Sequence, residues 1–247
     1  MKRHLIRVIG FALPLVFLAT GCPSRRPAKG RTEVKEKPDI VEMRTKTLQE
    51  AEQKRNDWKN KLKAMDATQL AAALTSESDR GLEPFNSMAY TEAVSRGEAT
   101  APALAQSITK SDRSSLLTLL AVRKTSASAY NSVDPGKRVA VLVESLRTSK
   151  SFNTWGLPHV KWEYAAESLI GEGKAAEKSL TALLDDRREA PVWGNEDYLE
   201  YDRYKYRVCD YAWAMLAAIR KQPIDISPDP AVRDRQIAAL KSQPPPP

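Results

Sequence analysis

The stretch from residue 162 to residue 186 reads Trp162-Glu-Tyr-Ala-Ala-Glu-Ser-Leu-Ile-Gly171-Glu-Gly-Lys-Ala-Ala-Glu-Lys-Ser-Leu180-Thr-Ala-Leu-Leu-Asp-Asp186. Two runs of helix-forming residues flank a glycine-containing turn in this stretch. In the second run Leu180 and Leu184 are four residues apart, so they share one face of a helix. The stretch therefore predicts two helices joined by a tight turn.

The apolar pair in this stretch recurs along the chain at a constant interval. Leu104, Leu142 and Leu180 are separated by 38 residues each. The residue four positions after each of them is also apolar: Ile108, Leu146 and Leu184. An interval near 40 residues is typical of a repeat built from two helices. Since no alternation of polar and apolar residues is long enough to predict a strand, we expect an all-α body.

Helical patterns also occur outside the paired leucines. They cover residues 40–65, 69–74, 85–96, 114–124, 206–220 and 231–241. The first of these patterns carries an apolar heptad stripe that Arg44 and Arg55 interrupt. The interruptions favour a helix that packs on the first unit of the body over a committed coiled coil.

Three segments resemble parts of a HEAT-type repeat. Residues 162–186 have its first helix, glycine turn, second helix and aspartate exit, residues 207–219 resemble the first helix of a next unit, and residues 95–104 resemble a turn and a proline-bearing second helix. This resemblance implies a short α-solenoid. The implied organisation is an N-terminal helical cap, the repeat domain and a proline-rich tail, at residues 39–80, 81–241 and 242–247. Because the middle unit matches in apolar spacing only, an irregular helical bundle is the alternative.

The N-terminus has the pattern of an export signal. Lys2, Arg3 and Arg7 precede an apolar run that ends at Gly21-Cys22 and is shorter than the roughly 20 residues that span a bilayer. Its last residues, Leu-Ala-Thr-Gly-Cys, resemble the bacterial lipoprotein signal. An ordinary cleaved signal and an uncleaved anchor are the alternatives.

The lipoprotein resemblance implies a localisation for the protein. It implies removal of residues 1–21 as a signal peptide and acylation of Cys22, with palmitate as an expected acyl group. The protein would then be attached to a membrane of the bacterial cell envelope through the lipid on Cys22. Pro23 stands where an aspartate would retain the protein at the inner membrane, which favours the outer membrane, facing the periplasm.

The positive charge of the chain is concentrated near this signal. Nine of the 39 basic residues and two of the 31 acidic ones lie in residues 1–37, which leaves 30 basic against 29 acidic residues. Residues 22–38 are basic, contain prolines and have too few apolar residues to fold, so we expect a disordered tether. The pI near 9.4 therefore reflects the leader and the tether, and no nucleic-acid partner is expected.

Residues suited to catalysis are few. A chain cut before Cys22 has one histidine, His159, and Cys209 would be its one free thiol. We find no Cys/His cluster with metal-ligand spacing and no glycine-rich phosphate loop. The paired carboxylates at Asp185-Asp186 and Glu196-Asp197 have no feature that would separate their pKa values. We expect no enzyme, no metal and no cofactor, with a hydrolase that uses His159 as a further alternative.

The repeat lengthens in two connections, residues 149–161 and 187–205. Aromatic side chains are concentrated there among charged ones, and they supply the candidate partner-binding residues: Trp155, His159, Trp193, Tyr198, Tyr201 and Tyr204, with Phe152 beside them. Long connections in repeat proteins often lie on a functional face. The alternative is that these rings fold back into the seam between units.

These observations predict a lipid-anchored periplasmic protein that acts as a non-catalytic protein-binding or scaffold module. Another envelope protein is the expected partner, met along the aromatic connections. Peptidoglycan or another glycan is the alternative partner, because aromatic rings also stack on sugar rings. The step from fold to function rests on analogy with other helical-repeat proteins.

Overall fold

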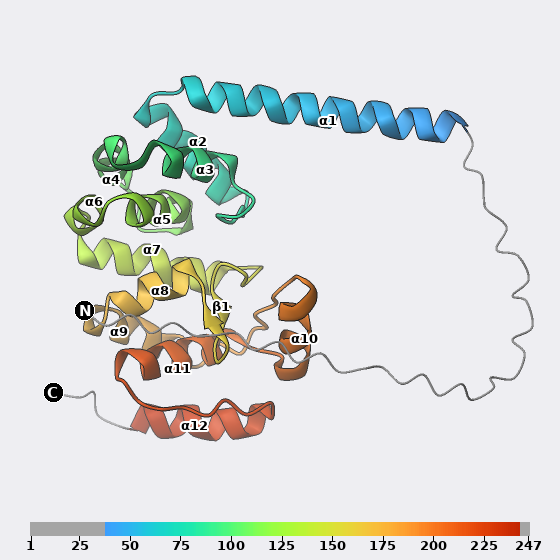
Figure 1. Cartoon of the computed structure of the whole chain (residues 1–247). Helices are drawn as coiled ribbons and strands as arrows, with labels where there is room; N and C mark the ends of the chain where they lie inside the picture. Colours follow the sequence, from blue (N-terminus) through green and yellow to red (C-terminus); the bar gives the residue numbers. More distant parts are fainter. Residues whose placement is uncertain (1–37, 243–247) are drawn as a thin grey trace, which may run out of the picture. The chain divides into compact units, whose positions relative to one another are not determined.

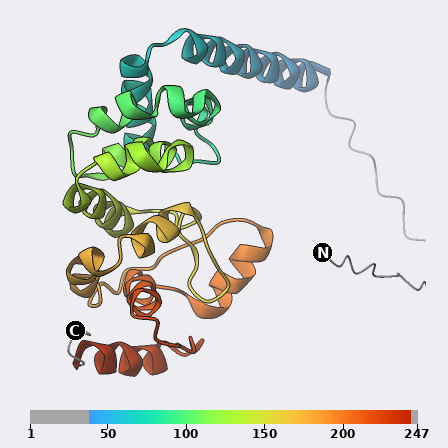
Figure 2. The same cartoon turned by 60° about the vertical axis from the view of Figure 1, so that its left-hand side comes forward.

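The computed structural model describes residues 38–242 (Figures 1 and 2). The predicted signal peptide and Cys22 lie outside the described residues. Of the predicted tether and the predicted tail, the structure describes only Pro38 and Ser242. Within 38–242 the chain forms twelve α-helices and two strands of two residues each. The all-α prediction is confirmed. None of the helices in this range combines the length and the apolar character that a bilayer span requires.

The chain divides into two parts, residues 1–50 and residues 51–247. The described portion of the first part is the N-terminal half of helix α1 (Pro38–Ala64). This half exposes the apolar side chains of Ile40, Val41, Met43 and Leu48. The second half of α1 and all other elements belong to the second part.

The second part contains eleven further helices and one hairpin. Their order is α2 (Ala67–Asp79), α3 (Met88–Arg96), α4 (Ala101–Ser107), α5 (Leu116–Thr125), α6 (Ala127–Ser132), α7 (Pro135–Thr148), β1 (Gly156–Leu157), β2 (Lys161–Trp162), α8 (Tyr164–Gly171), α9 (Lys174–Ala182), α10 (Asn195–Tyr204), α11 (Val208–Ile219) and α12 (Pro230–Ser242), with short 3-10 turns η1 (Gly97–Ala99) and η2 (Arg113–Ser115). Every segment predicted to be helical has a helix in the structure. The hairpin, α6 and α10 were not predicted.

The helices of the second part follow one another in layers that keep the order of the sequence (Figure 1). Helix α4 packs on α5, α5 on α7, α7 on α8 and α9, both of these on α11, and α11 on α12. Each layer therefore buries its apolar face on the layers before and after it. This order is what a two-helix repeat predicts, while the resemblance to a HEAT-type solenoid stays a prediction.

The leucines that recur every 38 residues mark the core face of successive layers. They lie in α4, α7 and α9, and the residues four positions later are buried with them: Leu104, Leu142, Leu180, Ile108, Leu146 and Leu184. Burial of each such side chain stabilises the fold by roughly 1.5–3 kcal/mol. The period in the sequence is thus a period in core packing.

Polar side chains join the first layers. The buried carboxylate of Glu77, on α2, accepts a 2.5 Å hydrogen bond from the Ser87 hydroxyl at the start of α3 and a 3.1 Å bond from the Trp58 indole on α1. The guanidinium of Arg96, at the end of α3, donates to the carbonyls of Leu62 and Met65 at 2.6 and 2.7 Å. The two bonds from Arg96 supply donors to backbone carbonyls at the C-terminal end of α1, where donors within the helix run out.

The last helix is held by a fully buried arginine. Arg233 on α12 lies 3.1 Å from the carboxylate of Asp210 on α11, and neither side chain is exposed to solvent. Arg233 also donates to the carbonyls of Ser227 and Tyr204 at 2.7 and 3.0 Å. Since a buried charge is costly unless it is paired and hydrogen-bonded, this set of contacts fixes α12 on α11.

Replacement of this arginine should destabilise the protein. In Arg233→Ala the carboxylate of Asp210 keeps only its 2.9 Å ion pair with Arg207, and the backbone carbonyls lose the donors that Arg233 supplied. We expect the free energy of unfolding to fall by about 3–5 kcal/mol in urea titrations. Arg235→Ala, at an exposed position of the same helix, is the control and should change it by less than about 0.5 kcal/mol. Equal stabilities of the two variants would contradict this account of α12.

Candidate functional site

The two long connections lie together on one side of the second part, near the loop between α2 and α3 (Figures 1 and 2). The first connection forms the antiparallel hairpin β1–β2, and the second forms α10. The backbone of Phe152 donates to the carbonyl of Pro191 at 2.8 Å. The backbone of Trp193 donates to the side-chain oxygen of Asn153 at 3.0 Å. The connections therefore hold each other in place.

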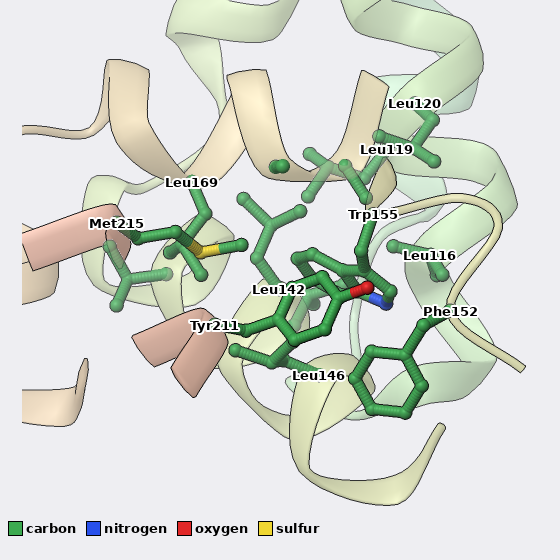
Figure 3. Close-up of a cluster of buried hydrophobic side chains, with 14 of the residues drawn as sticks. Leu116, Leu119, Leu120, Leu142, Leu146, Phe152, Trp155, Leu169, Tyr211 and Met215 are labelled. Carbon is green, nitrogen blue, oxygen red and sulfur yellow. The ribbon is translucent and has the colours of Figure 1, made fainter. Parts of the chain in front are cut away.

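Several aromatic residues of the connections fold back into the protein. Figure 3 shows Phe152 and Trp155 among leucines of α5 and α7 and beside Tyr211 of α11, and both side chains are fully buried. The Trp155 indole donates to the Ser149 hydroxyl at 3.2 Å. Tyr201 and Tyr204 are buried as well. This placement departs from the expectation that Trp155, Tyr201 and Tyr204 contact a partner, because their rings fill space between layers.

A glycine allows the hairpin to approach the core. Gly156 has φ +81°, and a Cβ atom there would lie 2.4 Å from the carbonyl oxygen of Lys161 across the hairpin. Its own carbonyl accepts a 2.6 Å hydrogen bond from the buried hydroxyl of Tyr211. Any other residue at position 156 would have to displace the facing strand.

His159 is engaged at both ring nitrogens. Nε2 lies 2.9 Å from the carboxylate of Glu200 on α10, and Nδ1 contacts the hydroxyl of the buried Tyr206. Because a carboxylate only accepts, Nε2 donates to Glu200 and Nδ1 accepts from Tyr206. Burial raises the pKa of Tyr206 well above its usual range, so this hydroxyl keeps its proton. Neither nitrogen of His159 is free to act on a substrate.

His159 should therefore contribute to stability. His159→Phe keeps a ring against Tyr204, whose centroid lies 4.5 Å from that of His159, but it removes the acceptor for the Tyr206 hydroxyl. We expect a loss of about 1–3 kcal/mol in urea unfolding, the cost of a buried donor without a partner. His159→Gln, which supplies an acceptor and a donor, should recover part of this loss. A phenylalanine variant as stable as the parent would refute the assignment.

Four aromatic side chains of the described residues are exposed, and two of them, Phe85 and Tyr164, line one cleft. Their exposed fractions are 73% for Phe85, 59% for Trp193, 41% for Tyr198 and 39% for Tyr164. The cleft has a volume of about 400 Å³. The residues that line it come from the α2–α3 loop, α3, the first connection, the start of α8 and α10: Pro84, Phe85, Tyr90, Asn153, Thr154, Glu163, Tyr164 and Asp197. We call it the aromatic cleft.

Trp193 and Tyr198 adjoin the aromatic cleft without lining it. Their rings are stacked, with centroids 6.3 Å apart and planes at 14°. Asn153, which lines the cleft, holds the backbone of Trp193, and Tyr198 follows Asp197 on α10. Of the six residues predicted to bind a partner, these two are exposed beside the cleft. The side chain of His159 is partly buried and paired with Glu200 of α10, and the other three are packed in the interior.

The polar groups of the aromatic cleft include buried atoms without partners. Thr154, which lines the cleft, is only 6% exposed, and its hydroxyl oxygen has no hydrogen-bond partner. Glu83, next to Thr154, is also 6% exposed and has an unpartnered Oε2. Burial raises the pKa of Glu83 against the opposing effects of Ser151, Thr154 and Arg113. Burial likewise raises the pKa of Tyr90 to about 12, so its hydroxyl stays protonated.

The raised pKa of Glu83 predicts a pH-dependent stability. Below the pKa of the unfolded state Glu83 is protonated in both states. As pH rises toward the higher pKa of the folded state, ionisation favours the unfolded chain, and stability falls. Glu83→Gln should therefore stabilise the protein near pH 8 and do so much less near pH 4, in urea unfolding. The exposed Glu98→Gln is the control, and a pH-independent gain would contradict the prediction.

Sequence reasoning missed most of this cleft. Helix 85–96 was expected to begin at Phe85, whereas α3 begins at Met88 and leaves Phe85 in the loop. A signal for this start was present, since Ser87 caps the helix by accepting from the backbone of Tyr90. Tyr164 was assigned to a helix without regard to its exposure. Asp197 was singled out only as half of a carboxylate pair.

Comparison of the chain with protein-family models, with curated proteins and with solved structures finds no match. Between residues 38 and 242, no three histidine, cysteine or carboxylate side chains lie close enough together to hold a metal ion. Cys209 is buried, and burial raises the pKa of its thiol to about 11. It therefore packs as a small apolar residue and lacks the thiolate character of a nucleophile.

Proposed function

We propose that this protein is a non-catalytic binding module of the bacterial cell envelope, anchored through a lipid on Cys22. It engages another envelope protein at the aromatic cleft. The observation that carries this proposal is the gathering of all four exposed aromatic side chains of residues 38–242 at and beside one cleft. The anchoring rests on the lipoprotein-like signal that ends at Cys22.

The physical chemistry of the cleft favours a binding role. Exposed aromatic rings that cluster are costly to keep in water and are typical of surfaces that a partner covers. Tyrosine and tryptophan are also the residues that contribute most at the centres of protein interfaces. A volume of about 400 Å³ is enough to receive one or two side chains of a partner.

The helical architecture of the body suits a binding role better than a catalytic role. The cleft is bounded by residues from five separate elements and loops. Glycan binding remains a second candidate, because the stacked Trp193 and Tyr198 present aromatic rings beside carboxylates that could accept sugar hydroxyls. The same experiment distinguishes the two.

The experiment is crosslinking in cells, followed by purification of the lipoprotein and identification of the attached proteins. The cleft variant Phe85→Ser/Trp193→Ser removes two exposed rings. The control variant Val160→Ser/Leu199→Ser removes two exposed apolar side chains outside the cleft lining. Because truncation of a central aromatic residue costs about 2 kcal/mol or more, we expect partners to be depleted about 30-fold in the cleft variant only.

Each result has one meaning when abundance and melting temperature are matched. Partners lost only in the cleft variant support the proposal. The same partners recovered with both variants would overturn it. Unchanged crosslinks combined with a cleft-dependent loss of binding to isolated peptidoglycan would replace the protein partner with a glycan.

A further inference from the structure

We infer that the aromatic cleft receives a basic side chain, lysine or arginine, from a segment of the partner protein. This inference rests on the proposed function and adds the chemistry that the partner must bring. It is carried by three features: the charge of the cleft lining, the exposed aromatic rings at the cleft and the buried polar atoms of Thr154 and Glu83.

The lining of the cleft is acidic. Glu163 and Asp197 are its two charged lining residues, and both are carboxylates. Lys161, which is not part of the lining, places its ammonium 3.6 Å from the carboxylate of Glu163 and 3.1 Å from that of Asp197. One lysine of the chain thus already bridges the two carboxylates, so the pair carries one more negative charge than Lys161 neutralises, and the next ammonium at the cleft is that of Lys124 at the Tyr164 hydroxyl. The side chains are 40% and 30% exposed, so a second cation can reach them.

The rings of the cleft suit the alkyl stem and the charged head of such a side chain. Lysine and arginine bury their methylene groups on apolar surface and keep the charge at a polar rim. The ammonium of Lys124 lies 4.6 Å from the centroid of the Tyr164 ring and contacts the Tyr164 hydroxyl, so one lysine of the chain already lies against this ring. Phe85 is the most exposed of the rings, and no cation of the described chain lies over it.

The unpartnered atoms favour a ligand that donates hydrogen bonds. The Thr154 hydroxyl and the Glu83 carboxyl lie next to each other and are buried, Thr154 lines the cleft, and neither the hydroxyl oxygen nor Glu83 Oε2 makes a hydrogen bond of good geometry. An ammonium or guanidinium brings several N–H donors and can satisfy buried acceptors. A purely apolar side chain would leave these atoms unsatisfied, and an anionic one would be repelled by Glu163 and Asp197.

The test is a selection of short random peptides against the full-length chain in detergent micelles. Enriched peptides are then measured by fluorescence polarisation, each beside a copy with norleucine in place of its basic residue. The neutralised variant is Glu163→Gln/Asp197→Asn. The control variant is Glu167→Gln/Asp202→Asn, which removes two carboxylates of α8 and α10 outside the cleft lining, whereas Glu163 precedes α8 as its N-cap residue.

We expect enriched peptides to share a lysine or arginine and to bind about tenfold or more weakly when norleucine replaces it. The neutralised variant should remove the difference between the two peptides, and the control variant should preserve it. Melting temperatures of both variants are compared with the parent, since replacement of an acid by its amide keeps the shape of the side chain.

Two other results would overturn the inference in distinguishable ways. Enriched peptides without a basic residue that lose binding in Phe85→Ser would leave the aromatic cleft as a protein-binding site and reject the basic side chain. Enriched peptides that bind Phe85→Ser as well as the parent, or a selection that enriches none, would reject the cleft as a protein-binding site and the basic side chain with it.

Discussion

Burial of Phe152 and Trp155 in the core between α5, α7 and α11 is the constraint on which the candidate site depends (Figure 3). Loss of such a side chain from a core costs about 3–5 kcal/mol, so these two positions are strongly fixed. Asn153 and Thr154 lie between them and are therefore held at the cleft. Asn153 in turn fixes the backbone of Trp193. Core packing thus sets the geometry of a surface feature.

Charged groups have two different roles in this protein. In the interior they fix the alignment of layers: Arg138 on α7 forms a 2.8 Å ion pair with Glu172 at the turn after α8, and both side chains are largely buried. A buried ion pair adds little net stability to a fold. It does fix the relative position of the two elements it joins, because separating the charges would leave one of them buried without a partner. The carboxylates of Glu163 and Asp197 are less buried and share a single lysine. They have capacity left for another cation.

The helices could be predicted because their signals are local. Leucines four residues apart, repeated every 38 residues, report the core face whatever the tertiary arrangement is. Helix α10 was missed although Tyr198, Tyr201 and Tyr204 stand three residues apart and so share one helix face, because the many charged residues between them made the segment resemble a connection. The local sequence does not determine whether an aromatic ring is buried. Trp155 and Trp193 occur in similar polar connections, and only contacts with distant helices distinguish them. The cleft itself combines residues far apart in sequence.

The balance of charge suggests how recognition at such a cleft would work. Residues 38–247 carry nearly equal numbers of basic and acidic side chains, so the body generates little long-range attraction toward a charged partner. Specificity must then come from short-range contacts, namely ring faces, two carboxylates and buried acceptors. Contacts of this kind act mainly by slowing dissociation. If the proposed lipid anchor and the partner were held at one membrane, their effective concentration would rise, and a cleft of modest intrinsic affinity would then suffice.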